Sequence, residues 1–416
     1  MGHFWHAFAD MAAVQAGGEL VLDRGEGAYI WDEQGRRYVD ATAGLWFCNV
    51  GYGRAELGDA AAAQMRKLPA YSTFGDFSNR PAAEAAERVG SLAPVEDSYV
   101  FLTSGGSDSI DTATKMARRY WQLLGQTERT LFITREHAYH GMHIAGTSLA
   151  GIEANVSGYG ALFTDVVRVA WDSPGELSRA IETAGRERVA AFFWEPIIGA
   201  GGVFAPPEGY LAEVRAICRD AGVLFVSDEV ITGFGRTGRW FASSRWDLQP
   251  DLITCAKGIT SGYLPMGAVI AAPWIAEPFR APGVGMWRHG YTYSGHAAVA
   301  AVALANIDII EREDLCGRAG LLEKELTEFL APLADHPLVG EVRSGTGAVA
   351  AVQIDPDAIA EDPGLPLRVV MASRDNGVLT RALASGALHV SPPLVIERAQ
   401  LQEMADGFRA ALDACG

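Results

Sequence analysis

Two pieces of sequence decide the fold: VLFVSDEVITGFGRTG, residues 223–238, and DLITCAKGITSGYLP, residues 251–265. Each contains an apolar run with the length and the β-branched content of a buried strand. Asp228 follows the first run, and Lys257 follows the second. Ligands of open α/β sheets bind where the strands end. We therefore expect Asp228 and Lys257 to belong to one site.

Lysine is scarce in this chain, which draws attention to Lys257. The sequence has thirty arginines and four lysines, at positions 67, 115, 257 and 324. Arginine stays protonated, whereas a lysine whose pKa falls on desolvation can act as an amine nucleophile. The alternative is a lysine at a strand end that only reaches solvent. The nearby Asp228 and the glycines after Lys257 favour a chemical role.

Composition limits the classes of partner. The chain has 416 residues, 49% of them hydrophobic, which is enough for a large buried core and for two domains. Its net charge of −17 argues against binding to nucleic acid or to an anionic membrane surface, because both need dense positive charge. An anionic ligand must therefore be held locally, by backbone N–H groups and a few basic side chains.

The cysteine pattern and the apolar segments indicate in which cellular compartment the protein is expected. The five cysteines are scattered and include no CxxC pair, so neither a disulfide framework nor a cysteine zinc site is indicated. The first residues, MGHFWHAFADMAAV, lack the basic region and apolar core of a signal peptide, and no run of eighteen apolar residues occurs. We expect a soluble protein in a reducing cytoplasm.

The order of the predicted elements indicates an α/β fold. A turn-rich segment, residues 1–60, contains a predicted hairpin and then Trp46, which is either a hydrophobic anchor or a wall of a substrate pocket. Strands alternate with helices over residues 61–315, which predicts a mostly parallel sheet with helices on both faces. Residues 316–416 predict a smaller α+β domain. The predicted strands of the sheet are Tyr99–Thr103, Thr130–Thr134, Val166–Val169, Val189–Trp194, Val223–Ser227, Leu252–Ala256 and Gly267–Ala272.

The turn TSGGS, residues 103–107, is a candidate anion site. It lies between a predicted strand and a long predicted helix, where glycines let the backbone approach a ligand. We expect Ser107 to cap the helix, and the free N–H groups with the helix dipole to attract a phosphate. A tight connection without a ligand is the alternative. None of the lysines stands in a GK[ST] motif, which argues against a nucleoside triphosphatase.

Two other motifs carry little weight. Residues 233–238 read GFGRTG and satisfy GxGxxG, but the residues that follow do not predict a helix, so a dinucleotide site is not indicated. His137, His140 and His143 in HAYHGMH are interrupted by a glycine and have no carboxylate within the motif, which favours packing and hydrogen bonding over a metal site. Tyr139 between them offers a flat surface that could stack on a heteroaromatic ring or belong to the core.

Three features fit a single ligand. Pyridoxal phosphate (PLP) needs a lysine that forms an imine with its aldehyde, a carboxylate for its pyridine nitrogen and a site for its phosphate. Lys257, Asp228 and the turn at residues 103–107 could supply these three groups. A buried aspartate is costly without a partner, and a cationic ring nitrogen would be one.

The sequence resembles the class III aminotransferases, in particular their amine:pyruvate (ω-transaminase) branch. The likeness rests on SDEVITGFGRTG, PDLITCAKGITSGYLPMGAVI and HGYTYSGHAAVAAVALANIDII, and it extends from ATAGLWFCNVGYGR to GVLTRALASGALHVSPPLVI. It implies a PLP-dependent transferase of fold type I that acts as a homodimer with shared active sites.

The resemblance also implies roles for individual residues. Lys257 is similar to the Schiff-base lysine and Asp228 to the partner of the pyridine nitrogen, which makes them the catalytic pair. Arg381 is similar to a mobile arginine that receives a substrate carboxylate. The implied substrate-binding residues are Trp46, Phe74, Tyr139 and Arg381. The implied cofactor-binding residues are Ser104, Gly105, Gly106, Ser107, Tyr139, His140, Glu195, Asp228, Val230 and Lys257, with Thr292 contributed by the other subunit.

Departures from the family patterns concern the acceptor. Branches that use 2-oxoglutarate commonly read DEVQTG and EPIQGE, whereas this chain has Ile231 in place of the glutamine and Ala200 in place of a glutamate. Arg381 is then expected to have no internal carboxylate partner, which favours pyruvate over 2-oxoglutarate. Many members read NSGSEA where this chain has SGGSDS, so Gly105 removes one possible hydroxyl contact to the phosphate.

The implied reaction is a ping-pong transfer of an amino group from a primary amine, or an ω- or β-amino acid, to pyruvate. Lys257 would move the proton at the donor carbon, and Asp228 would keep the ring nitrogen protonated. Alternatives are an aminomutase or racemase on the same fold, a transaminase that uses 2-oxoglutarate, and a binding protein without activity.

Overall fold

A seven-stranded sheet forms the centre of the computed structural model, which describes residues 3–416. Its strands lie in the order β4-β10-β9-β8-β7-β5-β6, and only β10 runs antiparallel to its neighbours. The predicted, mostly parallel sheet is thereby confirmed. The strands are β4 (Tyr99–Thr103), β5 (Leu131–Arg135), β6 (Val166–Val169), β7 (Val189–Trp194), β8 (Leu224–Asp228), β9 (Leu252–Cys255) and β10 (Gly267–Ala271).

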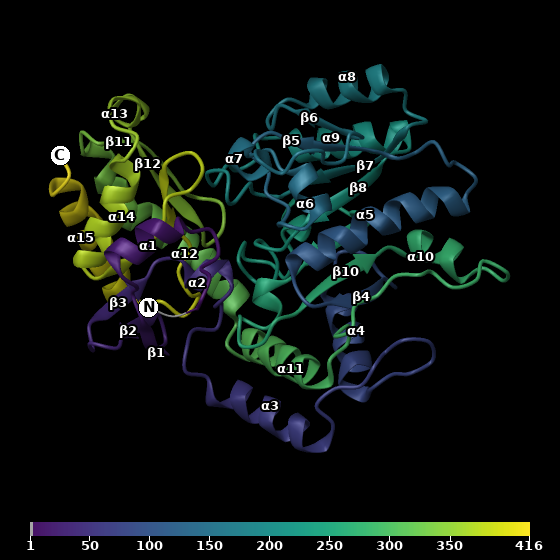
Figure 1. Ribbon diagram of the computed structural model, residues 1–416, viewed down its shortest axis with the longest axis horizontal. Coiled ribbons are helices and arrows are strands. Elements are labelled where there is room, and N and C mark those ends of the chain that lie inside the picture. Colours follow the sequence, from purple (N-terminus) through teal and green to yellow (C-terminus); the bar gives the residue numbers. More distant parts are fainter. Residues whose placement is uncertain (1–2) are drawn as a thin grey trace.

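Helices cover both faces of this sheet (Figure 1). In β8, Leu224 and Val226 pack in one core cluster with α5, whereas Phe225 packs in another with α9. This alternation is the period of two of a strand that is buried on both faces. The helices of this part are α3 (Ala55–Lys67), α4 (Arg80–Leu92), α5 (Gly106–Leu123), α6 (Ile144–Leu149), α7 (Glu153–Val156), α8 (Pro174–Ala184), α9 (Tyr210–Ala221), α10 (Pro273–Arg280) and α11 (Ala297–Arg312).

The register of β8 and β9 positions the site. Asp228 pairs with Thr254 across the two strands, and Lys257 stands three residues further along the second of them. Every residue of β7, β8 and β9 is buried, so these strand ends cannot shift without moving the core. The GxGxxG stretch, residues 233–238, forms turns and a short 3₁₀ helix follows at η1 (Ala242–Trp246), which excludes a dinucleotide-binding helix there.

The beginning and the end of the chain fold together. The first strands continue into a four-stranded sheet whose last member comes from the C-terminal part, in the order β1-β2-β3-β13. Figure 1 shows this as purple elements beside yellow ones. The strands are β1 (Leu22–Glu26), β2 (Tyr29–Asp32), β3 (Arg37–Asp40) and β13 (Val378–Leu379), and a third sheet contains β11 (Val339–Arg343), β12 (Ala350–Ile354) and β14 (Ala387–Val390).

Further helices pack around the two smaller sheets and connect them to the seven-stranded sheet. They are α1 (Met11–Gly17), α2 (Ala43–Trp46), α12 (Leu315–Leu330), α13 (Pro356–Glu361), α14 (Leu365–Asp375) and α15 (Arg398–Asp413), with 3₁₀ turns at η2 (Lys257–Ile259) and η3 (Ala331–Asp335). Within residues 3–416, no helix has the length and apolar character needed to cross a membrane.

Candidate active site

A cavity of about 690 Å³ lies where β7, β8 and β9 end. The turn before α5 and the arm that follows β13 also contribute residues to its walls. The structure therefore brings together side chains that are far apart in the sequence. The predicted site residues that line this cavity are Trp46, Gly106, Ser107, Tyr139, His140, Glu195, Asp228, Val230, Lys257 and Arg381.

Asp228 is held in place by three hydrogen bonds at the end of β8. His140 Nδ1 lies 2.7 Å from Oδ2, at a distance where an imidazole N–H donates to a carboxylate. The backbone N–H of Val230 and the hydroxyl of Thr254 donate to Oδ1, at 3.1 and 3.2 Å. Asp228 is 5% exposed. This carboxylate is thus fixed and desolvated, and it faces the cavity.

His140 has one ring nitrogen without a partner. The residue is 1% exposed, and within residues 3–416 no atom hydrogen-bonds to its Nε2. The His motif of the sequence therefore separates in the structure. The His140 ring forms a hydrogen bond with Asp228. The His143 side chain is 47% exposed, and its Nδ1 lies 3.6 Å from Asp108 Oδ1.

Lys257 stands in η2, directly after β9. Its backbone has φ of +48°, and the side-chain amide of Asn306 on α11 fixes the turn by donating to the carbonyls of Gly258 and Ile259. Burial lowers the pKa of the Lys257 ammonium to about 8, and the nearby Asp228 only partly offsets this effect. Lys257 is therefore a lysine with a substantial neutral fraction near physiological pH.

The turn before α5 opens toward the same cavity. The first intrahelical hydrogen bond runs from Ser109 N to Gly105 O, so the N–H groups at the start of the helix have no partner within it. The predicted cap is wrong: Gly105 occupies the N-cap position, and the Ser107 hydroxyl instead accepts a hydrogen bond from Met142 N. A Cβ at Gly106 would approach Val230 Cγ1 to 2.9 Å, so this wall of the cavity requires glycine.

Glu195 braces two segments around the cavity. Its Oε1 accepts a hydrogen bond from Tyr139 N and its Oε2 one from Gly199 N, both at 3.0 Å. Burial raises the pKa of the Glu195 carboxyl, and His140 opposes the shift. The Glu195 contacts set the position of Tyr139 and of the loop that carries Ala200.

Arg381 has no acidic partner. Within residues 3–416, no carboxylate oxygen lies within 4.0 Å of its guanidinium. Its Cζ lies 4.5 Å from the centre of the Trp46 ring, and burial lowers the pKa of the guanidinium to about 10. Ala200 and Ile231 line the same cavity. The expected lack of an internal ion pair for Arg381 is therefore observed.

Some predicted site residues lie outside this cavity. Ser104 and Gly105 are in the turn before α5 but do not line the cavity. Phe74 is 54% exposed and lines a different cavity. Thr292 is exposed on the segment before α11. The roles of Phe74 and Thr292 in the site remain predictions.

Sequence reasoning missed several residues of the wall. They include Phe8, Leu45, Ile110, Ile152, Asn155 and Leu383. It also missed His389, whose ring packs on Trp46 with 3.8 Å between centroids. A histidine inside the apolar strand β14 was the one visible indication, because buried polar side chains need a reason to be there.

The fold and the site define a class of protein. A lysine of lowered pKa, a fixed carboxylate and an open helix N-terminus meet in one cavity, with Tyr139 and Val230 beside them. These are the groups that PLP requires for its aldehyde, its pyridine nitrogen, its phosphate and its ring faces. Lys257, which has no carboxylate within 4.0 Å among residues 3–416, and the glycine wall at Gly106 also fit this ligand. The class is a PLP-dependent enzyme of fold type I.

Comparison with known proteins identifies the family. The family described as "Aminotransferase class-III" matches residues 11–412. A putrescine–pyruvate aminotransferase of Pseudomonas aeruginosa is 40% identical, over 99% of this chain and 94% of that protein. The chain therefore belongs to the class III aminotransferases, which are PLP-dependent enzymes.

Solved structures agree with this assignment. A thermostable (S)-enantioselective ω-transaminase from Thermomicrobium roseum matches with a TM-score of 0.95 and 38% identity, over 99% of this chain and 96% of that chain. An amine transaminase from an uncultivated Pseudomonas species, in its PLP-bound form, matches with a TM-score of 0.95 and 36% identity, over 100% and 99% of the two chains.

Proposed function

We propose that this enzyme transfers an amino group from a primary amine, or an ω- or β-amino acid, to pyruvate by a ping-pong mechanism. The observation that carries the proposal is the state of Arg381, a desolvated guanidinium without a carboxylate partner in the described chain. Such a group binds the carboxylate of an oxoacid well, because charge-assisted bidentate hydrogen bonds are strong in a desolvated site.

Six residues of this cavity would hold PLP. Asp228 would accept a hydrogen bond from the protonated pyridine nitrogen and so keep that nitrogen protonated, and His140 keeps Asp228 in position. The N–H groups of Gly106 and Ser107, with the dipole of α5, would bind the phosphate. The Lys257 amine would bond to the aldehyde carbon of the cofactor. Val230 and Tyr139 would cover the two ring faces.

Lys257 would also move protons during the reaction. Bound PLP supplies an electron sink for the pair of electrons left when the donor carbon loses its proton. Lys257 Nζ would take that proton and return it, which requires the neutral amine that burial favours.

The acceptor follows from the groups around Arg381. A glutamate at position 200 could pair with Arg381, but this chain has alanine there. Ile231 packs closely on the loop, since a Cβ at Gly199 would lie 2.4 Å from Ile231 Cδ1. The site thus offers one cation and apolar surface, which fits a small monocarboxylate better than a dicarboxylate. The name of the P. aeruginosa relative supports the same acceptor.

A half-reaction screen tests the proposal. The PLP form is mixed with a panel of amines, ω-amino acids and β-amino acids, and loss of the cofactor absorbance band is followed. Pyruvate is then added, and alanine is quantified. We expect bleaching by at least one donor, and recovery of the band with one alanine per site. An aminomutase or racemase would release no alanine, and that result would contradict the proposal.

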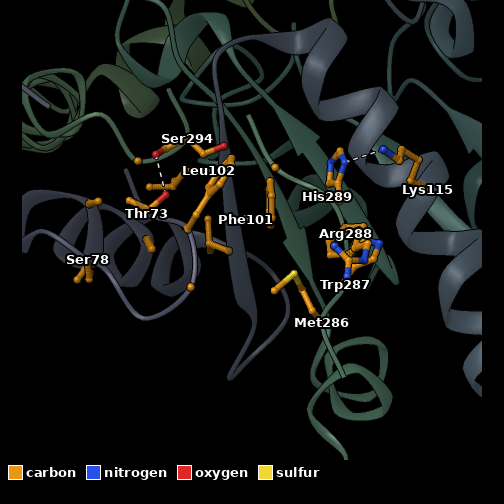
Figure 2. A pocket seen from close by; sticks show the side chains of 18 residues that line it. Thr73, Ser78, Phe101, Leu102, Lys115, Met286, Trp287, Arg288, His289 and Ser294 are labelled. Atoms are coloured by element: carbon orange, nitrogen blue, oxygen red, sulfur yellow. Dashed lines mark hydrogen bonds between the residues drawn. The ribbon is translucent and has the colours of Figure 1, made fainter. Parts of the chain in front are cut away.

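We also propose a homodimer with shared sites. A second cavity, of about 820 Å³, lies between residues 73–78 and residues 286–295. Figure 2 shows side chains that line it. Exposed apolar side chains surround it, including Phe74 at 54% and Met286 at 73%. Exposed patches of this kind mark protein interfaces, and Thr292 lies on the same segment. A second copy seated here would explain the exposure of Phe74 and Thr292, which the family resemblance places at the active site.

Sedimentation velocity tests the dimer. The native enzyme should sediment as a dimer, and Met286→Glu should weaken association. The Met286→Glu variant should also bind PLP less tightly, if Thr292 of the second copy reaches the phosphate. A native monomer with full PLP affinity would contradict the proposal.

We also propose a cytoplasmic location. It is supported by the five free cysteines in the described chain.

A further inference from the structure

His389 occupies an unusual place beside the active site. It lies in β14, is 0% exposed, and its ring centroid is 3.8 Å from that of Trp46. Its Nε2 lies 2.6 Å from the Ser391 hydroxyl, while Nδ1 has no partner within residues 3–416. The family reaction assigns no role to this histidine, so its burial requires another explanation.

The Trp46 ring is positioned by packing and not by a hydrogen bond. Trp46 is 2% exposed, has a left-handed backbone with φ of +62°, and its Nε1 has no partner in the described chain. An indole without a polar anchor takes its orientation from the groups that touch its faces. The imidazole of His389 is such a group, and it contacts Trp46 through its ring face.

The Arg381 guanidinium in turn packs over the ring of Trp46. The guanidinium Cζ lies 4.5 Å from the Trp46 ring centre, and Arg381 Nε is buried without a hydrogen-bond partner among residues 3–416. A ring face attracts a guanidinium without occupying its N–H donors. Arg381 is therefore held near the cavity while its donors stay available for a carboxylate. A glutamate in place of the ring face would occupy those donors.

His389 suits this arrangement because it is neutral. Burial lowers the pKa of His389 well below its usual range, and Arg381, Arg236 and Lys257 lower it further. A neutral ring stacks on Trp46 without repelling the neighbouring guanidinium. The backbone links the two residues as well, since His389 N donates to Arg381 O at 3.0 Å.

We infer that His389 is a positioning residue: packed against Trp46 with the two ring planes tilted by 32°, it fixes the indole against which the Arg381 guanidinium lies until it binds the carboxylate of the acceptor. This inference rests on the proposed function, because an acceptor carboxylate must reach Arg381. It identifies the contacts between His389, Trp46 and Arg381 as the element that sets affinity for the oxoacid, separately from affinity for an amine donor that has no carboxylate.

Two substitutions separate the stack from the hydrogen bond. His389→Asn keeps a polar group for Ser391 but loses the aromatic face, and His389→Phe keeps the face but loses the polar group. We expect the Asn variant to raise KM for pyruvate about fivefold to tenfold, with KM for 1-phenylethylamine and kcat changed less than twofold. The Phe variant should stay within twofold of the parent enzyme. Ser391→Ala, which keeps the imidazole, should also leave KM for pyruvate within twofold.

A double-mutant cycle with Arg381 tests the path of the effect. In an Arg381→Leu background, His389→Asn should cause no further rise in KM for pyruvate, because the group that it positions is gone. Propionate, a carboxylate that does not react, should bind His389→Asn more weakly by the same factor as pyruvate. If the Asn variant does not fold, His389→Leu replaces it, with the same expected rise.

The outcomes separate this inference from the proposed function. A parent enzyme that makes no alanine from pyruvate contradicts the proposed function before any variant is made. With an active parent, equal effects of His389→Asn on both substrates, equal losses in the Phe and Asn variants, or additive effects with Arg381→Leu would each overturn the role of His389.

Discussion

His140 Nδ1 lies 2.7 Å from Asp228 Oδ2, which joins the loop after β5 to the end of β8 inside the cavity. Both residues are nearly inaccessible to solvent. A buried carboxylate needs partners, and His140 is the one side chain among the three donors to Asp228 that reaches it from outside β8 and β9.

Removing His140 should therefore weaken PLP binding. His140→Ala leaves Asp228 Oδ2 without a donor, which costs about 1–3 kcal/mol in a buried site. We expect the dissociation constant of PLP to rise roughly tenfold to a hundredfold, measured by titrating the apoenzyme and following absorbance. His143→Ala is the matched control, since its exposed side chain does not touch Asp228, and an equal loss there would refute the role of His140.

The pKa of Lys257 predicts a pH dependence. The pKa of this lysine is lowered to about 8, so its amine is mainly protonated below that pH and mainly neutral above it. Only the neutral amine attacks an aldehyde. The rate of PLP uptake by the apoenzyme should therefore rise about tenfold per pH unit up to about pH 8 and then level off. A rise that continues to about pH 10, as for an exposed lysine, would disagree with this account.

Gly106 should resist substitution. In Gly106→Ala the new Cβ would meet Val230 Cγ1 at 2.9 Å, closer than real Cβ contacts allow. The wall of the cavity must then shift, and we expect PLP affinity to fall about tenfold or more. Gly105→Ala provides the comparison, because a Cβ there meets no atom within 4 Å and its φ of 173° suits any residue. A loss at position 105 as large as that at 106 would argue against the predicted clash.

Arg236, in the GFGRTG turn, should matter for stability and not for chemistry. It is 0% exposed and donates to Asn49 Oδ1 at 2.5 Å and to Pro392 O at 2.7 Å, which ties three distant segments together. Arg236→Leu leaves these acceptors unpaired, and we expect the thermal midpoint of unfolding to fall by at least about 5 °C. Arg179→Ala removes only an exposed pair with Glu176, so a shift below about 1 °C is expected. Equal shifts would contradict the structural role of Arg236.

The sequence predicted the core sheet well because its strands are short apolar runs bounded by turn residues. β4, β6 and β7 have the predicted bounds, since apolar runs between turn residues mark such strands clearly. The exposed strand β1 and the short helices α6 and α7 were not predicted, because their residues carry little periodicity. The pairing of β3 with β13 joins positions more than three hundred residues apart, and no local pattern indicates such a contact.

The residues of the site also fall into those that the sequence could predict and those that it could not. Lys257 and Asp228 could be found because each ends an apolar strand. The stack of His389 on Trp46 could not, because it depends on a contact between β14 and the strained turn at residues 43–46. The sequence predicted Ser107 as the N-cap of α5, but the N-cap is Gly105, two residues earlier. A serine stands on each side of the two glycines, so the pattern alone does not define where the helix begins.

The acceptor preference tests the central claim most directly. With one reactive amine donor held at saturation, kcat/KM is measured for pyruvate and for 2-oxoglutarate. In the described part of the chain no carboxylate lies within 4.0 Å of the Arg381 guanidinium, and Ala200 and Ile231 line the same cavity. We therefore expect a preference for pyruvate of at least about tenfold, a difference of about 1.4 kcal/mol in transition-state binding. Similar values for both acceptors, or a higher value for 2-oxoglutarate, would contradict the account.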